Sequence, residues 1–93
     1  MTVISEKILS IIIPHYNSLK GLDVLLNTIP QKEAYQVIVI DDHSSCELEE
    51  LSGKFNWVEF VFQSKGKKWA GAARNKGLSL AEGKFILFAD SDD

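Results

Sequence analysis

The chain has 93 residues, 45% hydrophobic and 25% charged, a balance typical of one small globular domain and not of a disordered or fibrous protein. Its formal net charge of −3 offers no basic surface for nucleic-acid phosphates, so no nucleic-acid partner is expected. The single cysteine, Cys46, excludes an intramolecular disulfide, and without a signal peptide or a bilayer-spanning apolar run we expect a cytoplasmic protein, including one held at the cytoplasmic face of a membrane by further sequence.

The N-terminal third predicts a buried strand followed by an amphipathic helix. Residues 8–14 form a continuous apolar run rich in isoleucine, which is typical of a strand buried on both faces, and Pro14 is expected to end it. Leucine and isoleucine side chains then recur at helical spacing, so we expect a helix with Asn17 or Ser18 as its N-cap and an end near Pro30.

Two further strands with a short helix between them follow. Residues 35–42 repeat the pattern of a buried strand, and the acidic segment 46–55 predicts a short helix that ends around Gly53. Residues 57–63 alternate between apolar and polar side chains, which indicates a strand at the edge of the sheet.

The last third predicts a basic loop at residues 64–71, a helix at 72–83 and a fourth strand at 84–90. The apolar side chains on one face of that helix are Ala72, Ala73, Leu78 and Ala81. Alternating strands and helices are typical of an α/β fold with a Rossmann-like parallel sheet and flanking helices. Because domains rarely end on a carboxylate cluster, we expect residues 1–93 to be one truncated domain.

Carboxylates gather where the second and fourth predicted strands end. Asp41 and Asp42 close the second strand and Asp90, Asp92 and Asp93 the fourth, so a parallel sheet would bring them to one edge. Like charges there must be neutralised by protonation, by cationic side chains or by a metal ion, and aspartate oxygens suit Mg²⁺ or Mn²⁺. In extended chain, Asp90 and Asp92 would point the same way, one toward the metal and one toward its diphosphate ligand. The same segments would also suit surface turns or helix N-caps.

Other side chains near this edge have less distinctive patterns. Arg74 lies among small residues that permit close approach, and we expect it to brace the acidic site. Tyr16 suits either stacking on a flat base or packing under its loop. His15 is expected to form hydrogen bonds and not to act as a general base, since no Ser or Cys nucleophile accompanies it. Trp57 and Trp69 are expected to pack in the core or at an edge.

Three segments in this order resemble the hallmark segments of family-2 glycosyltransferases. They are SIIIPHYN at residues 10–17, VIVIDDHSS at 37–45 and GAARNKGLSLAEGKFILFADSDD at 71–93. The resemblance implies a GT-A fold, a nucleotide-diphosphate-sugar donor (UDP-sugar above others), a divalent metal and inversion at the anomeric carbon. In the full-length protein it implies a saccharide or lipid-linked acceptor, as in polysaccharide biosynthesis.

The resemblance also implies roles for individual residues. Pro14, Tyr16 and Asp42 match positions that cradle the nucleobase, usually uracil. Asp90 matches a residue on the ribose side, and Asp92 matches the principal metal ligand, which Asp90 would assist. The whole set expected to bind the nucleotide-sugar is Pro14, Tyr16, Asn17, Asp41, Asp42, Arg74 and Asp90.

Two histidines depart from the family pattern. His43 stands where many relatives have glycine, so the turn is expected to be tolerant or slightly reshaped. His15 stands where threonine is frequent, which could alter contacts to the base. The family's acceptor site and its catalytic aspartate or glutamate come later in the sequence, so we expect no catalytic residue here and little or no activity from the chain alone.

Two other functions remain open. A nucleotidyltransferase of related fold should carry a glycine-rich basic phosphate loop after the first strand, and PHYNSLKG lacks that density. A non-catalytic interaction domain could keep the same fold. An unpaired edge of the truncated sheet could also drive self-association.

Overall fold

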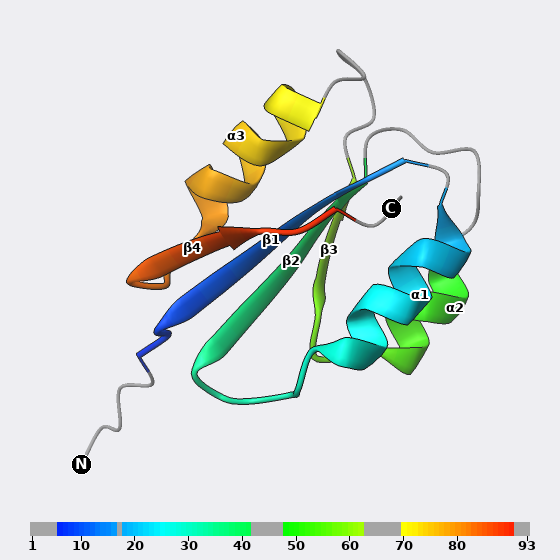
Figure 1. Ribbon diagram of the computed structural model, residues 1–93, viewed down its shortest axis with the longest axis horizontal. Helices are drawn as coiled ribbons and strands as arrows, with labels where there is room; N and C mark the ends of the chain where they lie inside the picture. The colour runs from blue at the N-terminus through cyan, green and yellow to red at the C-terminus, as the bar shows by residue number, and fades with distance from the viewer. Residues whose placement is uncertain (1–5, 17, 42–47, 63–69, 91–93) are drawn as a thin grey trace.

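The computed structural model describes residues 6–16, 18–41, 48–62 and 70–90, in which strands and helices alternate along the chain (Figure 1). The strands are β1 (Leu9–His15), β2 (Tyr35–Asp41), β3 (Glu59–Phe62) and β4 (Phe85–Phe88). The helices are α1 (Leu19–Thr28), α2 (Glu49–Lys54) and α3 (Ala70–Leu80), and none of these described helices has the length and apolar character to cross a membrane. The elements follow the predicted order, although α3 begins inside the segment expected to be a loop and ends before Gly83.

The described strands form a four-stranded parallel sheet in the order β3-β2-β1-β4. This order confirms the predicted parallel α/β class and places β3 at an edge, as expected. The chain moves outward from β1 to β3 and then crosses back to place β4 on the other side of β1. In doubly wound sheets, ligands bind where the direction changes, at the carboxyl ends of the strands.

Strand β1 runs one residue past Pro14, which corrects the expectation that the proline ends it. The carbonyl oxygens of Ile8 and Ile12 accept hydrogen bonds from the N–H groups of Phe85 and Ala89, at 2.9 and 3.0 Å. Alternate residues of β1 therefore face β4, and Pro14 continues that alternation. Because the pairing with β4 ends at Ile12, the missing N–H of Pro14 leaves no ladder bond unmade.

The two faces of the sheet are covered by different helices (Figure 1). Helices α1 and α2 cover the face on which the larger apolar cluster lies, and α3 covers the other face. The buried members of the larger cluster are Ile11, Ile13, Leu22, Leu26, Val37, Val39, Leu48, Leu51, Phe55 and Val58. The buried members of the smaller cluster are Ile12, Ile38, Ile40 and Ala73. Strands β1 and β2 are thus buried on both faces, as their continuous apolar runs predict.

Helix α3 approaches β1 through small residues. A Cβ on Gly77 would overlap the side chain of the fully buried Ile12, so the close approach requires glycine. Ala73, one turn earlier, is also fully buried, whereas Leu78 is 45% exposed. Ala73 and Gly77, four residues apart, therefore form the contact face, and Leu78, expected on the same face as Ala73, does not belong to it.

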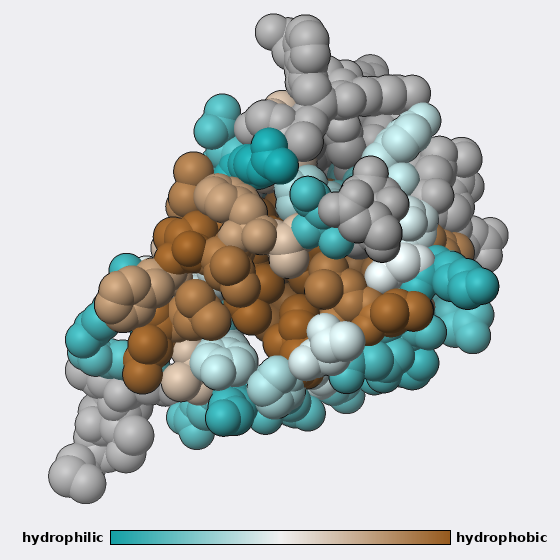
Figure 2. Space-filling view, in the orientation of Figure 1, coloured by the Kyte–Doolittle hydropathy of each residue, from teal (hydrophilic) through white to brown (hydrophobic). Residues whose placement is uncertain are grey.

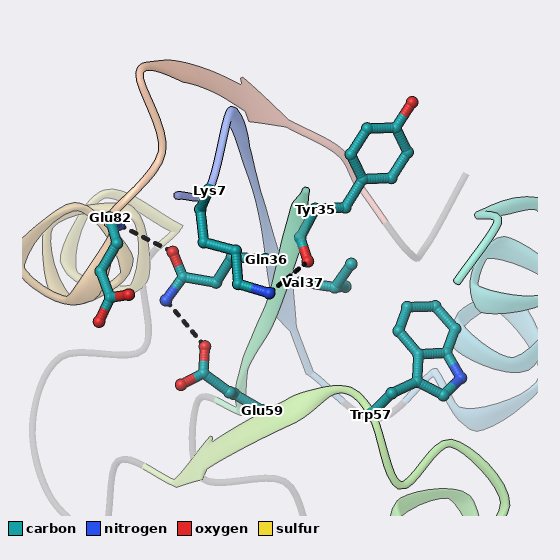
Figure 3. A pocket seen from close by; sticks show the side chains of 7 residues that line it. All are labelled: Lys7, Tyr35, Gln36, Val37, Trp57, Glu59 and Glu82. Atoms are coloured by element: carbon teal, nitrogen blue, oxygen red, sulfur yellow. Dashed lines mark hydrogen bonds between the residues drawn. The ribbon is translucent and has the colours of Figure 1, made fainter. Parts of the chain in front are cut away.

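Gln36 anchors a polar network at the amino end of the sheet. Its side-chain oxygen accepts a hydrogen bond from the Ser10 hydroxyl at 2.7 Å. The same oxygen accepts a hydrogen bond from the Glu82 N–H at 2.8 Å (Figure 3). The Ser10 hydroxyl itself accepts a hydrogen bond from the Gly83 N–H at 2.8 Å. Ser10 and Gln36 are buried in otherwise apolar strands, so these bonds satisfy groups that water does not reach.

The amide nitrogen of Gln36 extends this network to β3 and α3. It donates hydrogen bonds to Glu59 Oε2 at 2.9 Å and to the Leu80 carbonyl oxygen at 3.1 Å. A hollow of about 250 Å³ opens beside these groups, with Lys7 and Trp57 among its lining residues (Figure 3). The hollow lies at the amino end of the sheet, opposite the edge where the sequence predicts nucleotide binding.

Candidate functional site

The carboxyl edge of the sheet collects the predicted site residues that the structure describes. Pro14 and Tyr16 come from the end of β1, Asp41 ends β2, and Asp90 follows β4. Arg74 comes from α3, on the opposite face from α1 and α2. This is the convergence expected of parallel strands, whose carboxyl ends share one edge. Binding of a nucleotide-sugar by these residues stays a prediction.

Arg74 and Asp90 form an open charged pair at this edge. The distance between Arg74 Nη2 and Asp90 Oδ1 is 3.7 Å, and the two side chains are 41% and 49% exposed. The guanidinium carbon also lies 5.8 Å from the centre of the Phe88 ring, so the ring helps to orient the cation. An exposed pair at this distance adds little stability, and both groups remain accessible to a ligand.

His15 and Asp41 form a second, buried pair beneath the edge. His15 Nδ1 lies 2.9 Å from Asp41 Oδ1, and only 2% of His15 and 4% of Asp41 is exposed. The other ring nitrogen, Nε2, accepts a hydrogen bond from the Ser18 N–H at 2.9 Å. His15 is thus a hydrogen-bonding residue, as expected, and the Asp41 carboxylate, expected to bind nucleotide, already has a partner inside the protein. The pairing was missed because the register that aligns His15 with Asp41 cannot be read from the sequence.

The described aromatic side chains near the predicted site and the core have different environments. Tyr16 is 47% exposed at the end of β1, which leaves part of its ring accessible to a ligand. Trp57 packs partly buried against the larger apolar cluster, and its ring meets that of Phe55 edge-on with centroids 6.4 Å apart. The expectation that Trp57 is a packing residue is confirmed.

Several predicted residues lie outside the described residues: Asn17, Asp42, His43, Cys46, Trp69, Asp92 and Asp93. Within residues 6–16, 18–41, 48–62 and 70–90, no three His, Cys, Asp or Glu side chains are grouped closely enough to hold a metal ion. Asp90 is described, but Asp92, the expected principal ligand, is not. The Mg²⁺ or Mn²⁺ site therefore stays a prediction.

Comparison with known proteins identifies the family. The family model for Glycosyl transferase family 2 matches residues 10–93. The chain belongs to this family. Family membership agrees with the resemblance of its sequence segments and favours a glycosyltransferase over the nucleotidyltransferase alternative.

Relatives with named activities cover almost the whole chain. The chain is 37% identical to the poly(ribitol-phosphate) beta-glucosyltransferase of Bacillus spizizenii, over 91% of this chain and 15% of that protein. It is 36% identical to the poly(ribitol-phosphate) beta-N-acetylglucosaminyltransferase TarS of Staphylococcus aureus, over 90% of this chain and 16% of TarS. The chain therefore spans less than a fifth of the length of these two relatives.

Solved structures of TarS share the fold. TarS 1-349 in complex with UDP aligns with a TM-score of 0.80 and 34% identity, over 91% of this chain and 27% of that one. TarS 1-349 in complex with UDP-GlcNAc aligns with a TM-score of 0.81 and 33% identity, over 91% of this chain and 26% of that one. These alignments confirm that the sheet and its helices belong to a GT-A glycosyltransferase fold.

Proposed function

We propose that this chain binds the nucleotide-sugar donor, a UDP-sugar, for an inverting sugar transfer. The observation that carries the proposal is the alignment of 91% of the chain, at 34% identity and a TM-score of 0.80, with TarS 1-349 in complex with UDP. The polar carboxyl edge supports the same conclusion from the chain's own residues, because its exposed groups lie where parallel α/β sheets bind ligands.

The exposed residues of the edge suit the parts of such a donor. Tyr16, 47% exposed, is proposed to line the nucleobase together with Pro14 and Asp42. Arg74 places a cation beside Asp90 and so lowers the repulsion that a diphosphate would meet at an acidic edge. Asp90 is proposed to contact the ribose side of the donor.

A divalent metal, Mg²⁺ or Mn²⁺, is proposed to be held by Asp92 with help from Asp90. The half-exposed Asp90 carboxylate fits this role, because oxygen is the donor atom that both ions prefer and its oxygens are open to solvent. When bound, the ion would neutralise charge on the diphosphate leaving group. The protein's own part is to orient the nucleotide and to keep Arg74 beside the carboxylates.

The acceptor and the catalytic base are proposed to belong to sequence beyond these 93 residues. The related proteins are named for poly(ribitol-phosphate), so we propose a polymeric acceptor of that kind, or another saccharide or lipid-linked one. The chain alone should then bind donor without transferring sugar, because transfer needs a positioned acceptor and a base.

Titration of the ¹⁵N-labelled chain with UDP, followed by NMR with and without Mg²⁺, tests the proposal. We expect Mg²⁺-dependent shifts of the Tyr16 and Arg74 signals and binding about tenfold weaker in Asp92→Ala, a loss of about 1.4 kcal/mol. Asp23→Ala is the matched control, because Asp23 pairs with Lys54 on the α1–α2 side and its loss should leave the affinity for UDP unchanged.

Each arm of this titration has an outcome that contradicts part of the proposal. If UDP causes no shifts with or without Mg²⁺, the chain does not bind donor, and the non-catalytic interaction domain becomes the better interpretation. If UDP binds equally well without Mg²⁺ and to Asp92→Ala, the metal role of Asp92 is wrong while nucleotide binding stands.

We also propose that copies of the chain associate through β4. All four side chains of the strand are apolar and 39–66% exposed, and among the described strands only β1 pairs with it. Figure 2 shows apolar surface gathered over this strand. A second copy fits best, because an edge strand without charge or proline can pair with its own symmetry mate.

Light scattering measures this association directly. We expect a mass that rises with concentration for the chain and a monomer mass for Leu87→Lys, which places a charge on the edge strand. Val24→Lys is the control, because Val24 is exposed on α1 and its charge should not affect β4. A monomer mass for the unmodified chain at high concentration would end this proposal.

A further inference from the structure

The side chain of His15 connects three segments that meet below the carboxyl edge. It ends β1, its Nδ1 meets the Asp41 carboxylate at the end of β2, and its Nε2 meets the Ser18 N–H at the start of α1. Both contacts are 2.9 Å long, and the His15 side chain has no exposed surface. His15 therefore acts inside the protein and does not face a ligand at the edge.

The two contacts define the protonation of the ring. Nε2 accepts the Ser18 N–H, so Nε2 carries no proton, and the proton on Nδ1 is donated to Asp41. The contacts therefore correspond to the Nδ1–H tautomer of the ring, with Asp41 Oδ1 as its acceptor. A second proton, on Nε2, would place one donor against another and break the hydrogen bond from the Ser18 N–H.

We propose that His15 is a positioning residue for nucleotide binding, an inference that rests on the function proposed above. Tyr16 follows His15 directly in the sequence, and Asp42 follows Asp41, so the ring connects the two strand ends that precede two predicted base-contacting residues. The second contact, to Ser18, fixes the start of α1 relative to both strands. His15 acts on nucleotide affinity through these neighbours and not by touching the nucleotide.

The tautomer can be measured without any nucleotide. Long-range ¹H–¹⁵N correlation NMR of the histidine rings, at mildly alkaline pH, distinguishes a protonated from an unprotonated ring nitrogen. The chain has two histidines, so His43→Asn assigns the signals. We expect a single His15 tautomer with the proton on Nδ1. A proton on Nε2, or an average of both tautomers, would overturn the arrangement whether or not the chain binds UDP.

Two substitutions separate the two contacts. In His15→Asn the amide nitrogen can take the place of Nδ1 and donate to Asp41, but the side chain is too short to reach Ser18. In His15→Gln the amide oxygen can take the place of Nε2 and accept from Ser18, but no donor stands at the Nδ1 position. In His15→Ala both contacts are lost. We expect UDP affinity to fall about tenfold or more in His15→Ala and less in the other two variants.

A destabilised control distinguishes positioning from general stability. Gln36→Met removes partly buried hydrogen bonds at the other end of the sheet, and we expect its UDP affinity, measured well below the melting temperature, to stay within about twofold of the original. If His15→Ala also stays within about twofold, His15 is merely structural and the proposal is wrong. If the unmodified chain does not bind UDP, the proposed function fails instead, and the tautomer measurement still decides the geometry.

Discussion

The two ends of the sheet both interrupt apolar strands with polar side chains, but they differ in how far those side chains are satisfied. At the amino end, Gln36 makes hydrogen bonds of 2.7–3.1 Å to groups of the protein itself. At the carboxyl end, Arg74 and Asp90 stand 3.7 Å apart and remain 41% and 49% exposed. Satisfied buried groups specify a fold, whereas exposed charges held at a fixed place can recognise a ligand.

The His15–Asp41 pair is satisfied inside the protein and also lies close to the predicted ligand-binding edge. It is as buried as the network around Gln36, yet it lies directly beneath the carboxyl edge. We therefore expect substitutions at the amino end to change stability alone, substitutions at the exposed edge to change affinity alone, and substitutions of His15 to change both.

The largest expected effect is the loss of stability in Gly83→Ala. A Cβ at this position would lie 2.6 Å from the Ser10 backbone nitrogen and 2.8 Å from the Leu9 carbonyl carbon, and the central strand cannot move away. We expect urea denaturation to show a loss of about 3 kcal/mol in the free energy of unfolding. Gly53→Ala is the matched control, because nothing lies within 4 Å of its added Cβ, and it should be neutral or slightly stabilising. Equal stability of the two variants would show that the turn at Gly83, between α3 and β4, does not pack against β1 as described.

Gln36→Met should have the second largest effect. The substitution keeps a similar volume but leaves the Glu82 N–H and the Leu80 carbonyl oxygen without their partner. Partly buried groups left without a partner predict a loss of about 1–2 kcal/mol, measured by the same denaturation. Gln31→Met makes the same change at an exposed position and should stay within about 0.5 kcal/mol of the original. Equal losses in the two variants would show that the hydrogen bonds of Gln36 do not contribute the stability assigned to them.

Much of the fold follows from the sequence because its signals are local. The isoleucine run before Pro14 and the apolar run of residues 35–42 predict the central strands, and the leucines after Ser18 predict α1. The contact face of α3 was predicted only in part: Ala73 lies on it as expected, but hydrophobicity also points to Leu78, whereas close packing selects Gly77.

The site could be predicted only as far as topology fixes it. Parallel strands bring their carboxyl ends together, so Asp41 and Asp90 were expected at one edge before any coordinates. The register of the strands is a long-range property, so nothing in the sequence shows that His15 lies opposite Asp41 or that Gln36 lies opposite Ser10. These pairings decide which polar residues are satisfied internally and which remain for a ligand.

Arg74→Gln should change stability least of the three substitutions. Because it should still lower affinity for UDP, it distinguishes the carboxyl edge of the sheet most clearly from the amino end. Because the pair with Asp90 is exposed, the free energy of unfolding should change by less than about 1 kcal/mol. Affinity for UDP should fall about tenfold, because the cation beside the acidic edge is lost. Lys54→Gln removes the cation of another exposed pair, 2.9 Å from Asp23, and should leave affinity unchanged. If both variants lower affinity equally, the effect of Arg74 is one of net charge and not of its place at the carboxyl edge.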